Sequence, residues 1–149
     1  MARSQSYDRA DWHSGGKYPP DLPPENGGTH IGMFLAWAIL HDLEGQQHQE
    51  DSQADLAAVR SRKMTGRDFL FRDCDGKFWE DDLSEEGNEF ARWYFAPESG
   101  GYGSYIEDYE SLLAAKLPTV YHVADTWENF DKLAPVIDRR FAEWKQKRP

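Results

Sequence analysis

The side chains best able to do chemistry in this chain are acidic, and they gather between residues 73 and 89. Eight of these seventeen residues are Asp or Glu and only Lys77 opposes them, so the segment carries −7 of the chain's net charge of −10. Clustered carboxylates suit a hard cation such as Ca²⁺, or a basic partner surface. The EF-hand calcium pattern fails here, because Phe78 stands where that loop requires glycine. This acidic segment therefore favours docking to a basic partner, with a solvated acidic turn as the alternative.

Two aromatic residues, Phe78 and Trp79, lie in the middle of this charge, and we expect both to be exposed. Aromatic side chains that become buried at an interface carry much of its binding energy, whereas the surrounding charges steer the partner. The acidic segment therefore predicts a partner-binding surface with two aromatic anchors. Its expected contact residues are Asp75, Phe78, Trp79, Glu80, Asp81, Asp82, Glu85 and Glu86.

Histidines form the second group of candidate residues. His30 and His41 fall on one face of an expected helix, and the free N–H groups of its first turn favour a neutral imidazole at His30. Such an imidazole can act as a base or as a ligand. His13 and His122, each beside an aromatic residue, could fold toward His30; the alternative is that the helical histidines only satisfy local hydrogen bonds. The possible pocket would be lined by Trp12, His13, His30, Trp37 and His122.

Established catalytic and metal-binding motifs are absent from the sequence. It has no His-Glu-x-x-His or paired Cys-x-x-Cys zinc motif, no Walker loop, no dinucleotide fingerprint and no Gly-x-Ser-x-Gly elbow. Cys74 is a poor nucleophile candidate, because the carboxylates around it raise the pKa of a thiol. We therefore expect no catalytic residue, no metal ion and no cofactor.

Length and composition limit the class of protein. A chain of 149 residues fits one domain, residues 1–149, and 14% aromatic content is far too high for a disordered polyanion. The net charge disfavours nucleic acid and anionic membranes, whose phosphates need Lys and Arg. A single cysteine rules out an internal disulfide and suits a reducing compartment. Since no apolar stretch fits a signal peptide or a membrane span, we expect a cytoplasmic protein.

Periodicity predicts a mainly α fold, a single compact helical domain of about five to seven helices with at most a minor short strand or hairpin. Its centre is an expected helix over residues 30–44, capped by Thr29 and stopped by Gly45, whose apolar residues lie all round the cylinder. Residues 1–29 form an irregular arm rich in Pro and Gly, and we expect its aromatic side chains to pack it on the body.

The remaining elements mostly follow the same helical period. Thr65 can cap a helix, and Pro135 should kink or restart the last one. The turn at Asp75-Gly76 fits a β-hairpin, but its heavily charged flanks favour a helix–turn–helix. Further expected elements are a helix near 53–63, one from Asp82 or Ser84 to about Phe95, one opening at Ser104, a strand at 119–123, and a helix capped by Asp125 with Glu128.

Two segments resemble those of a family of short, uncharacterised bacterial proteins. They are residues 7–13, Tyr-Asp-Arg-Ala-Asp-Trp-His, and residues 28–39, Gly-Thr-His-Ile-Gly-Met-Phe-Leu-Ala-Trp-Ala-Ile. Residues 81–90 and 119–127 fit the resemblance too, so it spans most of the chain. The family brings no established catalytic residues. Small acidic bacterial proteins of this general kind are similar to immunity proteins, which neutralise a cognate toxin in the cytoplasm; this is an analogy of size, charge and compartment.

Two functions remain open. The first is a non-enzymatic binding protein, an immunity-type inhibitor that presents the acidic segment to the basic cleft of a bacterial toxin. The second is a small enzyme or ligand-binding domain with a histidine-lined pocket near His30. It requires His13, His30 and a carboxylate such as Asp11 or Asp125 to converge. The oligomeric state stays open, and an oligomeric structural protein is a third possibility.

Overall fold

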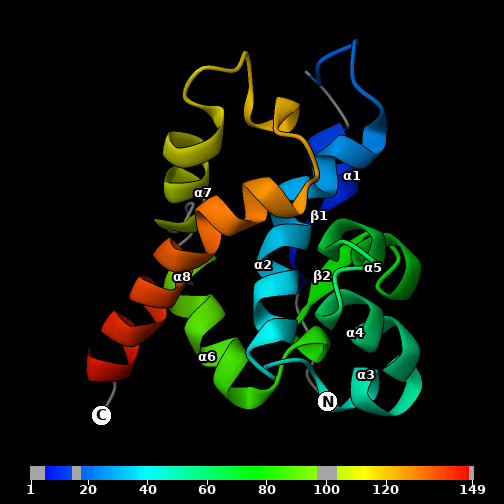
Figure 1. Cartoon of the computed structure of the whole chain (residues 1–149), viewed down its shortest axis with the longest axis vertical. Helices are drawn as coiled ribbons and strands as arrows, with labels where there is room; N and C mark the ends of the chain where they lie inside the picture. Colours follow the sequence, from blue (N-terminus) through cyan, green and yellow to red (C-terminus); the bar gives the residue numbers. More distant parts are fainter. Residues whose placement is uncertain (1–5, 15–17, 97–103, 148–149) are drawn as a thin grey trace.

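The computed structural model describes residues 6–14, 18–96 and 104–147, and over these residues the fold is mainly α-helical, as the sequence predicts (Figure 1). The central helix, α2, spans Thr29–Leu40. The other helices are α1 (Ala10–Ser14), α3 (Gln46–Asp51), α4 (Gln53–Arg60), α5 (Gly66–Asp73), α6 (Glu85–Tyr94), α7 (Ser104–Tyr109) and α8 (Trp127–Lys147). Shorter helical turns are η1 (Pro24–Gly28), η2 (Glu80–Asp82), η3 (Glu110–Ala114) and η4 (Val120–His122). Within the described ranges, no helix combines the length and the apolar character needed to cross a membrane.

The central helix α2 is buried on every face. Each residue from Thr29 to Ile39 is buried. In Figure 1 the helix runs through the middle of the molecule, with α4 and α5 on one side and α6 and α8 on the other. The aromatic ring of Phe34 is the centre of the core, because its centroid lies 5.0–6.4 Å from six other aromatic rings. The predicted central position of this helix is therefore confirmed.

The end of α2 differs from the prediction. The helix stops at Leu40, where Asp42 adopts a left-handed backbone (φ 58°) and the Leu43 N–H bonds back to the Ala38 carbonyl at 2.9 Å. This is the geometry of a helix C-terminus closed by its own backbone. Gly45 is therefore not the stop signal; it is the N-cap of α3, a helix that the sequence pattern did not predict.

Two predicted helix starts are confirmed by their caps. Thr65 Oγ1 accepts a hydrogen bond from the Asp68 N–H (3.2 Å) and begins α5. Ser84 Oγ accepts one from the Gly87 N–H (3.2 Å) and begins α6. Both bonds satisfy a backbone donor that the first turn leaves without a helical partner. Between these caps α5 ends at Asp73, as the helix–turn–helix prediction expects, but the turn at Asp75-Gly76 leads first into a short strand, Lys77–Trp79. Each alternative therefore describes one side of the turn.

A two-stranded antiparallel sheet joins the start of the chain to its middle. β1 (Ser6–Arg9) pairs with β2 (Lys77–Trp79), and the register sets Asp8 opposite Phe78. The turn before β2 uses left-handed backbone at Asp75 (φ 56°) and Gly76 (φ 73°). The first part of the arm is thereby held on the body by backbone hydrogen bonds rather than by aromatic packing alone.

Two predictions near the C-terminal half are wrong in detail. Residues 119–123 contain the 3₁₀ turn η4 (Val120–His122) and no strand, because Thr119 Oγ1 accepts the Tyr121 N–H (3.1 Å) and caps the turn. The last helix is capped by Thr126, whose hydroxyl accepts the Asn129 N–H (3.1 Å), and not by Asp125. It continues through Pro135 without a restart.

The crossing of α2 and α5 depends on two glycines. A Cβ on Gly66 would overlap the Gly32 carbonyl oxygen, and a Cβ on Gly32 would overlap the backbone of Arg67. Neither obstacle is a flexible side chain, so the two backbones approach closely because no side chain separates them. Gly32 and Gly66 therefore fix the distance between the central helix and α5.

We predict that Gly66→Ala destabilises the protein by about 1–3 kcal/mol, since overpacking forces the backbones apart. Helix propensity alone predicts the opposite sign, a gain of up to about 1 kcal/mol. Denaturant unfolding followed by circular dichroism distinguishes the two. Ala57→Ser, a similar enlargement on the exposed face of α4, serves as the control and should change stability little. A stabilised Gly66→Ala protein would contradict the crossing described here.

Candidate functional site

The acidic segment is folded into the body more deeply than predicted. Phe78 is fully buried in the aromatic core, so the expectation that it is exposed is wrong. The short strand β2 turns this side chain inward and leaves its neighbour Trp79 half-buried. Asp82 is also buried: it accepts hydrogen bonds from the Trp79 backbone N–H (2.7 Å) and from His48 Nε2 (2.8 Å). Phe78 and Asp82 are therefore structural and cannot touch a partner of the folded protein.

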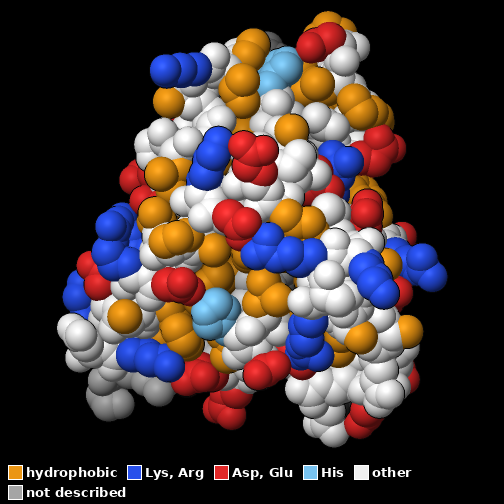
Figure 2. Space-filling model, viewed as in Figure 1, with side chains coloured by type: hydrophobic (Ala, Val, Ile, Leu, Met, Phe, Trp, Pro, Cys, Tyr) orange, Lys and Arg blue, Asp and Glu red, His pale blue; other side chains and the backbone are white. Residues whose placement is uncertain are grey.

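The other acidic residues still form a surface. Asp75, Asp81 and Glu85 are exposed, and Glu80 and Glu86 are half-buried. A shallow groove of about 590 Å³ opens where η2 leads into α6. In Figure 2 acidic side chains gather along the lower edge of the face shown, where α6 begins in Figure 1. This acidic groove is lined by Gln46, Gln47, Glu80, Asp81, Leu83, Glu85, Asn88 and Arg92.

The predicted pocket residues do not all meet. Trp12 is 57% exposed on α1. Trp37 donates its indole N–H to Asp138 (2.8 Å), and His122 pairs with Asp21 (3.0 Å). Only His13 and His30 come together, with ring centroids 4.5 Å apart. Neither of the carboxylates that the sequence suggested, Asp11 and Asp125, joins these two histidines.

Asp8, which the sequence did not single out, supplies that carboxylate. Its Oδ1 lies 2.7 Å from His13 Nε2 and its Oδ2 lies 2.9 Å from His30 Nε2. The three side chains come from β1, α1 and the first turn of α2, and we call them the Asp8 cluster. All three are buried or nearly so, with 4–11% of each side chain exposed. The two segments that carry the family resemblance are the ones that meet here.

The protonation of the Asp8 cluster follows from its burial and its hydrogen bonds. Burial alone would raise the pKa of Asp8, but the hydrogen bonds from His13 and His30 outweigh it and hold that pKa well below its usual range. Burial lowers the pKa of His30, and the hydrogen bond with Asp8 offsets this only in part. The cluster is thus an ionised carboxylate that accepts N–H groups from a neutral His30 and from His13.

A phenol extends the cluster toward the surface. The Tyr121 hydroxyl lies 2.8 Å from His13 Nδ1, the ring nitrogen opposite the one that faces Asp8. The tautomer of His13 sets which of these two atoms donates. Asn26 Nδ2 donates to the Tyr121 carbonyl (2.9 Å) and holds η4 in place. Carboxylate, imidazole and hydroxyl therefore form one chain of hydrogen bonds, an arrangement that can orient an imidazole for acid–base chemistry or for ligation.

A second buried cluster lies under the acidic groove. His48, Cys74 and Asp82, the Cys74 cluster, place their ligand atoms within 4.8 Å of one another. Cys74 Sγ (3.7 Å) and Asp82 Oδ1 (2.8 Å) both approach the same nitrogen, His48 Nε2. A catalytic Cys–His pair needs the orienting carboxylate on the opposite ring nitrogen. Burial, followed by Asp82 and Asp73, also raises the pKa of the thiol strongly, so the expectation of an unreactive Cys74 is supported.

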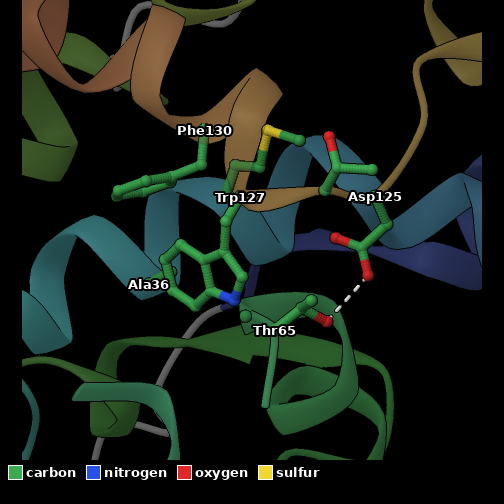
Figure 3. Close-up of a pocket in the computed structure, with 8 residues that line it drawn as sticks. Ala36, Thr65, Asp125, Trp127 and Phe130 are labelled. Atoms are coloured by element: carbon green, nitrogen blue, oxygen red, sulfur yellow. Dashed lines mark hydrogen bonds between the residues drawn. The ribbon is translucent and has the colours of Figure 1, made fainter. Parts of the chain in front are cut away.

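The cavity between α5 and the start of α8 is too small for a substrate (Figure 3). Its volume is about 10 Å³, close to the space of one water molecule. Asp125 accepts a hydrogen bond from the Thr65 hydroxyl (2.7 Å) at its rim. The indole N–H of Trp127 is buried beside it without a hydrogen-bond partner among the described residues. Asp125 is therefore held by Thr65, and it is not among the residues that converge with His13 and His30.

We predict that Asp8→Asn destabilises the protein by about 1.5–3 kcal/mol, because two buried imidazole N–H groups lose an ionised acceptor. The control is Asp11→Asn, which removes only an ion pair with Arg9 at a side chain that is 60% exposed and should cost under about 1 kcal/mol. Denaturant unfolding near pH 7 measures both. Equal losses in the two variants would mean that Asp8 is no more important than a surface acid.

We also predict that stability falls as the solution is acidified from about pH 7.5 to about pH 5. In the unfolded chain His30 takes up a proton below its ordinary pKa of 6.5, whereas in the folded protein its lowered pKa keeps it neutral. The unfolded state therefore binds more protons in this range, which favours unfolding. The contribution of Asp8 to stability is lost only at lower pH, below its ordinary pKa of 3.8. Thermal unfolding across this range should show a flatter slope for His30→Gln; parallel curves would refute the assignment.

Comparison with known protein families matches residues 6–123 to a family described as a domain of unknown function (DUF7832). The match includes the Asp8 cluster and the acidic segment. No curated protein matches the chain, and no solved structure does. Because the matched residues make up more than half of the sequence, the chain belongs to the DUF7832 family.

Proposed function

We propose that this protein is a non-enzymatic binding protein, an immunity-type inhibitor that docks on a basic surface of a bacterial toxin through the acidic groove. The observation that carries the proposal is the charge of the groove lining. Glu80, Asp81 and Glu85 contribute three carboxylates, against one cation, Arg92. A concave surface with a surplus of one sign attracts a partner of the other sign and raises its association rate.

The groove is supported by buried groups, which favours rigid docking. Asp82 holds η2 from beneath through the Trp79 N–H, and the Gly45 N–H donates to the Asp82 carbonyl (2.9 Å). The Ser84 N–H donates to the Leu43 carbonyl (2.8 Å) and ties the start of α6 to the turn that follows α2. A surface that is already ordered loses less conformational entropy on binding.

The mechanism would be occlusion, in which the acidic groove covers a basic catalytic cleft of the toxin in the cytoplasm. With Phe78 in the core, Trp79 is the remaining aromatic anchor, and it is half-buried. Recognition of the partner therefore depends more on the acidic side chains, and less on aromatic anchors, than the sequence suggested. Interactions of this kind between exposed charges are screened by salt, so binding should weaken steeply as ionic strength rises.

The test is affinity purification of a partner from the native host at low and at moderate salt. We predict that the wild-type protein recovers a basic partner and that Asp81→Lys with Glu85→Lys weakens its binding at least about 10-fold. Co-expression should also relieve the toxicity of the recovered partner with the wild-type protein and not with the double variant.

Glu107→Lys with Glu110→Lys is the matched control, because it makes the same change in net charge at exposed positions on α7 and η3. This control should bind as the wild type does. Thermal unfolding checks that both double variants are folded. Failure to recover a partner, or equal binding by both double variants, would exclude docking through the groove.

A further inference from the structure

We propose that Asp8, His13 and His30 bind a divalent transition-metal ion, of the class of Zn²⁺ or Co²⁺. This inference is independent of the proposed docking function, since the cluster lies at β1, α1 and α2 and the acidic groove at η2 and α6. Its basis is the convergence of three donor side chains on one point, from three elements in the first thirty residues, β1, α1 and α2. The ligand atoms all lie within 4.8 Å of one another.

The donor set selects the kind of ion. Two imidazole nitrogens and one carboxylate suit Zn²⁺, Co²⁺ and related ions, whereas Ca²⁺ and Mg²⁺ require mostly oxygen ligands. Three protein ligands leave at least one coordination position open for water or another ligand. An imidazole pair with a single carboxylate is therefore a site that can hold an ion and still bind something else.

The distances in the Asp8 cluster are close to those around a bound ion. Ligands about 2.0–2.1 Å from a metal ion lie about 2.9 Å apart at a right angle and about 3.3 Å apart at a tetrahedral angle. The Asp8 oxygens lie 2.7 Å from His13 Nε2 and 2.9 Å from His30 Nε2. A single ion would also have to bring the two Nε2 atoms to about 3.3 Å from each other. The ligand atoms of the three residues lie within 4.8 Å of one another, so the rearrangement stays local to the three side chains.

The charge of the cluster favours a cation. Asp8 is 7% exposed, and its hydrogen bonds come from His13, His30 and the Arg9 backbone N–H. The Arg9 guanidinium turns away and pairs with Asp11 (2.8 Å). Within the described residues, no Lys or Arg side chain pairs with Asp8. A buried carboxylate without a permanently charged partner is costly, and a divalent ion would supply the missing positive charge.

The surroundings of the histidines resemble the outer shell of a metal site. A metal-binding imidazole usually donates its second N–H to a fixed acceptor, which sets the tautomer and the ring orientation. Tyr121 occupies that place for His13, at 2.8 Å from Nδ1. The Tyr105 hydroxyl donates to the backbone carbonyl of His30 and fixes the first turn of α2. The His13 side chain is 11% exposed, so the cluster is not fully closed to solvent.

Among the residues that the structure describes, the Cys74 cluster is the competing group of ligands, and it is less suited to bind a metal ion. An ion there would have to displace the proton of a thiol that burial and two carboxylates keep protonated. At the Asp8 cluster, no thiol has to lose a proton, because the ligand atoms are one carboxylate oxygen and two imidazole nitrogens. The two sites give different spectra, because Cys74 is the single cysteine of the chain.

The experiment uses the untagged full-length chain, first stripped with a chelator. Zn²⁺ titration by calorimetry should give one bound ion per chain, and Co²⁺ should give visible absorption without a thiolate charge-transfer band. Nitrogen NMR of the imidazoles should show Zn²⁺-dependent shifts at His13 and His30 Nε2. His13→Ala should weaken binding at least about 100-fold, and Tyr121→Phe about 10-fold, as expected for loss of a ligand and of its outer-shell partner.

His122→Ala is the matched control: it removes a histidine next to Tyr121 whose side chain faces Asp21, and it should keep the wild-type affinity. Circular dichroism checks that each variant is folded, and the NMR readout needs no variant at all. The proposal is overturned if the wild-type chain binds neither ion. It is also overturned if His13→Ala binds as tightly as the wild type, or if a thiolate band appears that Cys74→Ser removes.

Discussion

The structure depends on one constraint: α2 is apolar on all sides, so the rest of the chain has to enclose it. Fully burying a single Leu, Ile or Phe side chain gives about 1.5–3 kcal/mol, and this helix contributes an unbroken run of buried residues. Enclosure requires neighbours at short distance on every face. On one face of α2, Gly32 and Gly66 allow α5 to pack at short distance. On another face, the aromatic rings around Phe34 fill the space.

The same enclosure creates the polar cluster. The first turn of a helix carries unpaired backbone N–H groups and, in this chain, a histidine, so burying it removes polar groups from water. His30 is 3% exposed and needs a partner inside the protein. Asp8 meets that need, and His13 and Tyr121 complete the hydrogen bonding of the carboxylate and of each other. A chain with a shorter arm would leave the start of α2 uncovered.

The sequence predicted the elements better than the contacts between them. The helical period and the caps at Thr65 and Ser84 depend on local chemistry, so the helices they begin were found. The end of α2 was missed, because a backbone turn through Asp42 closes it and no glycine marks it. Phe78 was misread because β2 has only three residues, too few for alternation to show, and its inward face is set by pairing with β1. Asp8 was overlooked for the same reason. A carboxylate in a four-residue strand becomes informative only when its neighbours in space are known, although its place in the motif shared with His13 was a signal.

The pairing of β1 with β2 also sets the order in which the protein can form. Asp8 and Phe78 are paired across seventy positions of sequence. At about 5–20 residues per second, a ribosome needs roughly 4–14 seconds to make the chain between them. During that time the arm has no strand to join, and the start of the central helix has no cover. Contacts between distant positions also close slowly after synthesis, because a long loop must be ordered first. The strand that carries Asp8 therefore gains its partner strand only after the middle of the chain has been made and has closed on the beginning.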